Sequence, residues 1–265
     1  MQVDSIKNIL IVALGVCLIC SILVSGAAVS LSGIQAENRK LDKLKNILEA
    51  GQLLKSDEPV EKVYREKIEA VLVDLSTGQT IPEAQQTGLL NIETFDIPKV
   101  AGDAQLGYAI PANEDIAQIK RRPKNMPVYL VKNGDAVEKI ILPIYGKGLW
   151  STMYGFLALD SDLKTVRGIT FYQHGETPGL GGEVDNPRWK SQWNGKKAFD
   201  DSGDVIIKVI KGAVDPNSPA SSHQIDGLSG ATITTRGVDK LIEYWLSDTG
   251  YGKYLETLKT EVNNG

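Results

Sequence analysis

The sequence predicts an α+β protein, with one N-terminal transmembrane helix followed by a soluble domain whose mostly antiparallel sheet is flanked by helices. Three observations predict this fold class. Residues 9–31 form an apolar run without a single charged side chain. Residues 127–174 and 204–212 contain short apolar runs that are typical of strands. Residues 238–246 carry apolar side chains at helical spacing.

Composition excludes several classes of protein. The 265 residues are 42% hydrophobic and 23% charged, which is usual for a globular chain and unlike a disordered or fibrous one. The formal net charge is -4, and the isoelectric point is about 5.4. Because the chain has no surplus of basic residues, we expect no nucleic acid partner.

The apolar run at residues 9–31 is long enough to cross a membrane. As a helix it would extend about 34 Å, against roughly 30 Å for the hydrocarbon core of a bilayer. We expect an uncleaved anchor with residues 1–8 on the cytoplasmic side. A cleavable signal peptide is the alternative, since Ser25, Gly26 and Ala27 offer small residues suited to a signal peptidase.

Cysteine and histidine usage argues against a metal centre. Cys17 and Cys20 both lie inside the apolar run, so the soluble part has no disulfide and no thiolate ligand. His174 and His223 are far apart in the sequence, and no carboxylate cluster accompanies them. We therefore predict no metal site and no catalytic residue.

The region 32–127 is predicted to be helical and rich in loops. Apolar residues at helical spacing predict a helix over residues 40–55. Residues 56–59, Ser-Asp-Glu-Pro, have the side chains of a helix start, and an amphipathic helix is predicted over 60–75. Residues 76–127 contain many prolines and little periodicity, which favours loops.

Residues 128–265 are predicted to form the core of the soluble domain. The dipeptide Asn133-Gly134 between two apolar runs indicates a hairpin. Two further strands are expected within 154–174 and a fifth in 204–212, followed by a helix after Thr232. The apolar face of that helix comprises Val238, Leu241, Ile242, Trp245 and Leu246.

Three glycine-containing loops are candidates for ligand binding. The stretches 145–151 (YGKGLWS) and 174–184 (HGETPGLGGEV) each follow a predicted strand and present apolar side chains, Trp150 and Leu180 among them. Glycine lets a backbone approach a flat ligand closely, although a long hairpin connection and a core tryptophan would explain the same patterns.

The third loop, DGLSGAT at residues 226–232, immediately precedes the C-terminal apolar helix. A helix N-terminus attracts anions, because its first N–H groups are unpaired. The small residues leave room around the hydroxyl groups of Ser229 and Thr232. The pattern suits a phosphate, but an ordinary capped helix would have the same sequence.

Taken together, these stretches resemble the covalent-FMN family. GLSGAT before a helix, GETPGLGGEVDNPRW after a strand and GLWS after another strand carry the resemblance. Within that family the chain is most similar to the C-type subunits of the sodium-translocating NADH:quinone reductase, the Nqr complex. The G-type subunits of the Rnf complex share the SGAT and ETPGLG elements and are the alternative. A membrane-anchored binding module without redox function is an alternative of another class.

The resemblance implies that residues 128–265 form an FMN-binding domain in which FMN is joined through a phosphoester to Thr232. Asp226, Ser229, Gly230 and Ala231 match the other positions of the family's attachment motif. The remaining cofactor-binding residues implied are those of the two strand-end loops: Leu149, Trp150, Thr177, Gly179, Leu180 and Gly181.

The resemblance also implies a role as an electron relay. Electrons would pass from iron–sulfur centres to this FMN, and then to a second flavin and to ubiquinone while Na⁺ is translocated. The implied partners are the other membrane and peripheral Nqr subunits, and a flavin transferase that attaches FMN.

The family places its soluble domain on the periplasmic side of the bacterial cytoplasmic membrane. Arg39, Lys40, Lys43 and Lys45 after the apolar run would favour the cytoplasmic side by the positive-inside rule. Since long domains translocate largely regardless of nearby charge, we expect the family's topology, with a single span.

Overall fold

The computed structural model describes residues 6–54, 58–134 and 136–264. The chain forms two compact units, Met1–Lys43 and Leu44–Gly265. The helices are α1 (Ile6–Ala50), α2 (Val60–Lys67), α3 (Ile97–Gly102), α4 (Pro187–Ser191), α5 (Thr232–Leu246) and α6 (Gly252–Asn264). The strands are β1 (Ile68–Asp74), β2 (Thr80–Ile81), β3 (Gly107–Ala109), β4 (Arg121–Pro123), β5 (Asn125–Asn133), β6 (Ala136–Lys147), β7 (Thr152–Asp160), β8 (Val166–Gln173), β9 (Lys208–Val209) and β10 (Gln224–Ile225).

Helix α1 contains both the predicted membrane span and most of the predicted helix 40–55. It is long and apolar enough to cross a membrane, with a mean hydropathy of 2.8 over its most apolar window. The helix ends at Ala50, five residues before the predicted end, and Gly51 follows in a turn. In the predicted helix start at 56–59, Ser56 and Asp57 lie outside the described residues.

The main sheet has six strands in the order β2-β1-β5-β6-β7-β8, and every neighbouring pair is antiparallel. This arrangement confirms the predicted α+β class. The β5–β6 hairpin turns where Asn133-Gly134 predicted it, and Gly134 has a φ of 62°. Strands β6 and β7 pair without interruption from Lys139↔Asp160 to Lys147↔Thr152, so their connecting turn extends from one end of the sheet.

The predicted helix over residues 60–75 is wrong in its second half. Helix α2 ends at Lys67, and residues 68–74 form strand β1, which pairs along its whole length with β5. The run Ile-Glu-Ala-Val-Leu-Val-Asp contains several β-branched side chains, which favour a strand. Pairing with β5 also gives the backbone N–H and C=O groups of this run hydrogen-bond partners. Tertiary pairing therefore overrides the helical periodicity.

The predicted strand over residues 204–212 is reduced to the two residues of β9. It pairs in parallel with β10 in a separate small ribbon, apart from the main sheet. The Asp239 carboxylate accepts a hydrogen bond from the Val209 N–H, at 2.9 Å. This segment therefore runs along α5 and brings residues 210–214 close to the start of that helix.

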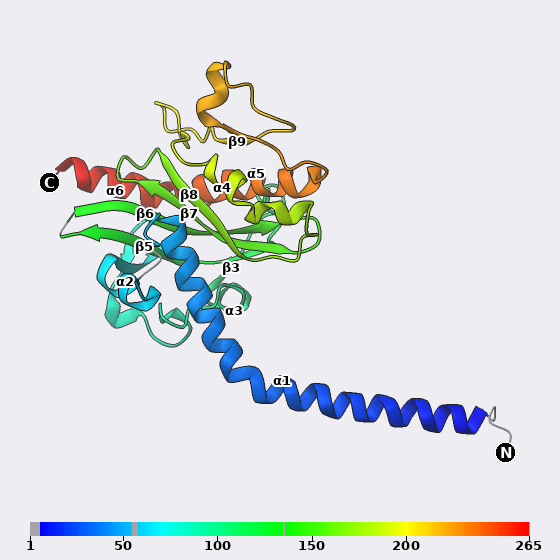
Figure 1. Ribbon diagram of the computed structural model, residues 1–265. Helices are drawn as coiled ribbons and strands as arrows, with labels where there is room; N and C mark the ends of the chain where they lie inside the picture. Colours follow the sequence, from blue (N-terminus) through cyan, green and yellow to red (C-terminus); the bar gives the residue numbers. More distant parts are fainter. Residues whose placement is uncertain (1–5, 55–57, 135, 265) are drawn as a thin grey trace. The chain divides into compact units, whose positions relative to one another are not determined.

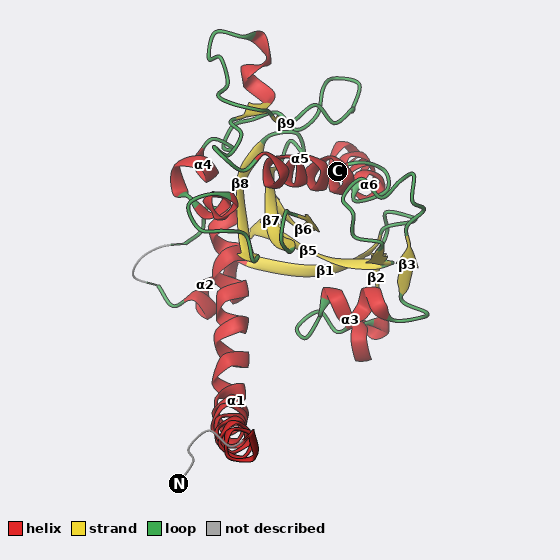
Figure 2. Ribbon diagram, turned by 90° about the vertical axis from the view of Figure 1, so that its right-hand side faces the viewer, coloured by secondary structure: helices red, strands yellow, loops and turns green. Residues whose placement is uncertain are grey.

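The sheet has an apolar core on each face. Figure 2 shows the sheet curving around α5 and α6, which pack against one face. The predicted apolar face of α5 is confirmed, because all five of its residues are buried. Trp245 Nε1 also donates a hydrogen bond to the Tyr145 carbonyl at 2.7 Å, which fixes α5 to β6. The opposite face packs against α2 and the last turn of α1 (Figure 1), and Ile47 and Leu48 are buried there.

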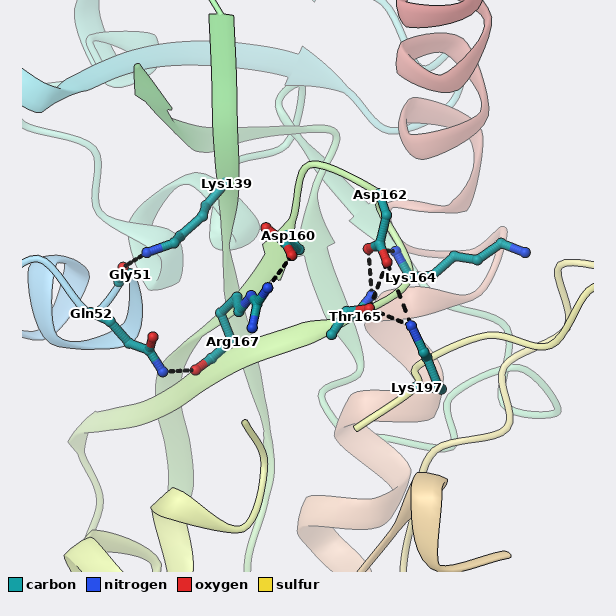
Figure 3. Close-up of polar contacts among 9 residues, drawn as sticks. All are labelled: Gly51, Gln52, Lys139, Asp160, Asp162, Lys164, Thr165, Arg167 and Lys197. Carbon is teal, nitrogen blue, oxygen red and sulfur yellow. Dashed lines mark hydrogen bonds and ion pairs between the residues drawn. The ribbon is translucent and has the colours of Figure 1, made fainter. Parts of the chain in front are cut away.

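The end of α1 is fixed to the sheet by side chains that bind its turn (Figure 3). Lys139 Nζ donates to the Gly51 carbonyl at 2.7 Å, and Gln52 Nε2 donates to the Arg167 carbonyl at 2.5 Å. The Arg167 side chain forms an ion pair with Asp160 across the β7–β8 hairpin. A lysine on a helix C-terminal carbonyl satisfies a group that would otherwise lack a partner.

Candidate functional site

The β6–β7 turn exposes two large apolar side chains. The Gly148 N–H donates to the Ser151 carbonyl at 2.8 Å, which closes the turn around Leu149 and Trp150. These side chains are 41% and 67% exposed. An exposed leucine beside an exposed tryptophan on a tight turn is an apolar surface available to a ligand.

The loop after β8 presents a third exposed apolar side chain. The Thr177 carbonyl accepts hydrogen bonds from the Leu180 N–H at 3.1 Å and the Gly182 N–H at 2.9 Å. Gly179 has a φ of 75°, and the short 3₁₀ helix Gly181–Asp185 begins directly after Leu180. This folding turns Leu180 outward, where it is 44% exposed.

The carboxylate of Glu176 joins the two loops to helix α5. Its Oε1 accepts from the N–H groups of Trp150 at 2.9 Å and Ser151 at 3.2 Å. Its Oε2 accepts from the Leu149 N–H at 3.1 Å and from the Thr234 hydroxyl at 2.6 Å. Glu176 is only 5% exposed, so this buried charge is balanced by four donors from two other segments.

The hydrogen bond between Glu176 and Thr234 requires a glycine at position 181. A Cβ there would lie 2.6 Å from Thr234 Oγ1 and 2.9 Å from Glu176 Oε2, which is closer than real Cβ atoms approach such groups. Gly181 therefore lets the loop after β8 lie directly against α5.

The hydrogen bonds determine the charge state of Glu176. Burial alone would raise the pKa of its carboxyl group. The bonds from Thr234, Trp150, Leu149 and Ser151 outweigh burial, and the pKa lies below its ordinary value. Glu176 is therefore a carboxylate at neutral pH.

A neighbouring histidine supports the same loop. His174 Nε2 lies 2.8 Å from Asp185 Oδ2, and Nδ1 accepts a hydrogen bond from the Glu176 N–H at 3.2 Å. The bond to Asp185 raises the pKa of His174, against the opposing effect of partial burial. No role was predicted for this histidine from the sequence. Its contacts connect the loop after β8 to the 3₁₀ helix Gly181–Asp185.

The loop 226–232 leads into the start of α5 and meets the loop after β8 there. Gly230 has a φ of 72°, a conformation that favours glycine, and a Cβ at this position would lie 2.9 Å from Leu180 Cδ2. Leu180 therefore lies directly against the backbone just before the helix. Ala231 is buried, whereas Ser229 is exposed.

The three threonines at the start of α5 differ in their contacts. Thr234 donates its hydroxyl to Glu176, and the Thr235 hydroxyl accepts from the Leu228 N–H at 3.0 Å; both are buried. Thr232 is the first residue of α5 and is exposed. Among the described residues, its hydroxyl has no hydrogen-bond partner. It is therefore the threonine of the three that is available for chemistry.

Asp226 holds the loop 210–214 in place. Its carboxylate accepts from the Val214 N–H at 2.7 Å and from Gln192 Nε2 at 3.1 Å. The adjacent Gly227 N–H donates to the Gly212 carbonyl at 2.8 Å. The structure thus gives Asp226 a supporting role in the loop.

A cavity of about 140 Å³ lies beside Thr232. Its lining includes Gly212 and Gly227 from the two joined loops, together with the basic residues Lys211 and Arg236. Neither basic residue was predicted from the sequence, nor were Glu176 and Thr234. Glu176 lies within the quoted GETPGLGG stretch, and a charged residue inside a glycine-rich loop was the one signal that could have drawn attention to it.

Apart from Asp226, the predicted site residues fall into two groups at the start of α5. Leu149, Trp150, Thr177, Gly179, Leu180 and Gly181 belong to the two loops joined by Glu176, and Ser229, Gly230, Ala231 and Thr232 form the approach to the helix. Among the described residues, no group of three or more His, Cys, Asp or Glu side chains could hold a metal ion.

Comparison with known proteins agrees with this geometry. Residues 148–247 match the model of the FMN-binding domain family, a range that contains all three loops and α5. The chain is 49% identical over 259 residues to NqrC, the C subunit of the Na(+)-translocating NADH-quinone reductase, from Pseudomonas aeruginosa, covering 97% of each chain. It is 45% identical over 260 residues to the protein of that name from Yersinia pestis, covering 97% of this chain and 94% of that one.

The chain belongs to the NqrC family of the Na(+)-translocating NADH-quinone reductase. A solved structure supports the same assignment. The crystal structure of NqrC from Shewanella oneidensis matches with a TM-score of 0.75 and 32% identity, covering 84% of this chain and 99% of that one. The resemblance inferred from the three loops is therefore confirmed.

Family membership has three direct consequences. As a member of the NqrC family, the chain is one component of a multi-subunit oxidoreductase, so other Nqr subunits are its partners. Its FMN-binding domain makes FMN its cofactor. Helix α1, with its long apolar segment, is the candidate membrane anchor of this component.

The residues present suit FMN. Exposed Leu149, Trp150 and Leu180 are apolar groups of the kind that contact a flat aromatic ring, and they lie on loops tied to the start of α5. Basic residues and a free hydroxyl meet at the cavity beside Thr232, as a phosphate requires.

Proposed function

We propose that FMN is attached through its phosphate to the hydroxyl of Thr232, and that the chain carries electrons within the Nqr complex. The observation that supports this best is the contrast among the threonines of α5. Thr234 and Thr235 are buried and use their hydroxyl groups in hydrogen bonds, whereas Thr232 is exposed and its hydroxyl is unused among the described residues.

The attachment needs an activated flavin phosphate, because direct condensation of a phosphate with an alcohol is unfavourable in water. We propose a flavin dinucleotide as donor. Thr232 Oγ1 attacks the flavin-side phosphorus, the phosphoanhydride P–O bond breaks, and the nucleoside monophosphate leaves with those electrons. A base of a separate flavin transferase takes up the threonine proton.

The apolar loops would orient the flavin ring. Leu149 and Trp150 from the β6–β7 turn and Leu180 from the loop after β8 are exposed, and Glu176 fixes both loops relative to α5. Thr177, Gly179 and Gly181 would provide backbone close to the ring. Since Glu176 joins the ring loops to the helix that begins with Thr232, the flavin would be held in one position.

The cofactor supplies the redox chemistry, since it accepts electrons from one part of the complex and passes them on to another. The protein's own residues bind, orient and partly shield it. We propose that electrons come from iron–sulfur centres in the complex and pass towards a second flavin and ubiquinone while Na⁺ is translocated. We further propose that the soluble domain lies on the periplasmic side of the inner membrane.

The deciding experiment is the substitution Thr232→Val. Valine keeps the size and β-branching of threonine but lacks the oxygen, so the protein should fold, insert and show no flavin fluorescence in a denaturing gel. Thr232→Ser should retain labelling, and mass spectrometry should place the flavin phosphate on the peptide that contains residue 232.

Ser229→Ala is the matched control, because Ser229 is the other exposed hydroxyl of the loop. Its band should fluoresce normally. A fluorescent Thr232→Val band of normal intensity, or loss of fluorescence in Ser229→Ala alone, would show that the attachment residue is misassigned.

A further inference from the structure

Two basic residues line the cavity beside Thr232. We propose that Lys211 and Arg236 bind the phosphoryl group that links the flavin to Thr232. This inference rests on the proposed attachment and names the residues that recognise its anionic part. Three observations support it. Both residues line one cavity, the neighbouring loops place Lys211 there, and neither residue has an ion pair among the described residues.

The cavity has the size of an anion site. Its volume is about 140 Å³, below the roughly 300 Å³ at which pockets for drug-sized ligands begin. A flavin ring would not fit in it, but a phosphoryl group would. Thr232 lines the cavity with both basic residues, and no carboxylate is among the described lining residues.

Three hydrogen bonds of neighbouring residues fix the segment that contains Lys211. The Ile210 N–H donates to the Ile225 carbonyl at 3.0 Å, and the Gly227 N–H donates to the Gly212 carbonyl at 2.8 Å. The Val214 N–H donates to Asp226 at 2.7 Å. Lys211 lies between these anchor points, so the attachment motif itself fixes the segment that carries the lysine.

Arg236 reaches the cavity from α5. It follows Thr232 by four residues, which places the two side chains on the same face of the helix, one turn apart. A guanidinium group one turn after an attached phosphoester can donate two parallel hydrogen bonds to its oxygens.

Two other lysines near these residues in the sequence do have an acidic partner. Lys208 lies shortly before Lys211 in the sequence, and Lys240 lies shortly after Arg236. Both bind the Glu243 carboxylate, at 2.6 and 3.0 Å. Among the described residues, Lys211 and Arg236 form no ion pair and no side-chain hydrogen bond. Two unpaired positive charges that line one small cavity repel each other, and an anion between them removes that repulsion.

The test is the stability that loading with flavin adds to the full-length protein in detergent. Lys211→Met/Arg236→Met removes both charges and keeps much of the side-chain length. Each protein is prepared flavin-loaded, and also with Thr232→Val to prevent loading. We expect loading to raise the melting temperature of the wild type by about 3 °C more than that of the double variant.

Two further double variants are controls. Arg65→Met/Lys259→Met makes the same change of charge at exposed positions elsewhere in the domain, which have no ion pair within the described part of the chain. This variant should keep the wild-type gain. Lys211→Arg/Arg236→Lys keeps both charges and should retain at least half of the difference. An equal gain in the wild type and in Lys211→Met/Arg236→Met would overturn the proposal.

Loading itself is measured by fluorescence in a denaturing gel. If Lys211→Met/Arg236→Met does not load while Lys211→Arg/Arg236→Lys does, the charges are needed at attachment and the proposal is supported. Failure of both variants to load would overturn it, because charge would not be the deciding property. An unlabelled wild type would instead contradict the proposed attachment, which is a separate result.

Discussion

Glu176 and Thr234 are joined by a hydrogen bond of 2.6 Å, in which the threonine hydroxyl donates to Oε2 of the carboxylate. The other acceptor positions of that carboxylate hold the N–H groups of Leu149, Trp150 and Ser151. The contact therefore connects the turn that presents Trp150 with the helix that begins at Thr232. Three segments that are distant in sequence become one rigid unit through a single buried side chain.

Replacing the carboxylate should loosen this unit. In Glu176→Gln an NH₂ group takes the place of one oxygen and faces a backbone N–H or the Thr234 hydroxyl. A buried group left without its partner costs about 1–3 kcal/mol. We expect a loss of stability in that range in denaturant unfolding, and faster amide exchange at Leu149, Trp150 and Ser151.

Two variants calibrate that result. Thr234→Val removes one donor and keeps the shape, so its cost should be smaller, about 1 kcal/mol. Glu114→Gln makes the same chemical change at an exposed position without a described partner and should have no measurable effect. An effect of Glu176→Gln no larger than that of Glu114→Gln would contradict the role assigned to this carboxylate.

The same carboxylate makes stability depend on pH. Because the pKa of Glu176 in the folded protein lies below the ordinary value of 4.5, the unfolded chain binds a proton more readily as pH falls. The stabilisation is complete above about pH 4.5 and is lost as pH falls through the folded pKa. The melting temperature of the wild type should therefore fall more steeply with pH than that of Glu176→Gln.

The measurement is a difference between two curves, recorded between about pH 3 and pH 6. Other carboxyl groups with lowered pKa values, such as Asp162 and Glu243, titrate equally in both proteins and cancel. Parallel curves over that interval would show that Glu176 gains nothing from its four donors.

The sequence predicted those parts of the fold that depend on local pattern. The hairpin at Asn133-Gly134 and the buried face of α5 follow from turn chemistry and periodicity, and both are confirmed. Strand β1 was missed because its side chains also fit a helix, and only pairing with β5 decides between the two. The short β9 shows the converse, since a strand-like run without a long partner forms little sheet.

The same distinction holds for the site. The glycine-rich loops, and the small residues that precede the C-terminal helix, are visible in the sequence. The three loops of the site were therefore predicted. The role of Glu176 could not be predicted, because its partners are three backbone N–H groups and one hydroxyl group, all more than twenty residues away. Lys211 was missed for a similar reason, since only the hydrogen bonds of Gly227 and Asp226 bring it to Thr232. The predicted boundary between 32–127 and 128–265 stays a prediction, although β1 from the first part pairs with β5 of the second.

Membrane topology is directly testable. We expect residues 1–8 on the cytoplasmic side and the soluble domain on the periplasmic side. A reporter enzyme that is active only in the periplasm, fused after Gly265, should be active. A cytoplasm-only reporter at the same place should be inactive. The opposite pattern would favour the positive charges from Arg39 to Lys45 as the determinant of orientation.

The proposed contact of Leu180 with the flavin ring leads to the last prediction. Leu180 is exposed and lies against the backbone at Gly230, next to the proposed attachment point. Leu180→Asp would place a carboxylate beside the ring while leaving Thr232 unchanged. A negative charge disfavours the addition of electrons nearby, so the reduction potential should fall and the visible spectrum should shift, with gel fluorescence preserved. Leu89→Asp, at another exposed leucine outside these loops, is the matched control and should leave potential and spectrum unchanged. If Leu180→Asp and Leu89→Asp give the same potential and spectrum as the wild type, the ring does not lie against Leu180, and the loop after β8 must serve another purpose.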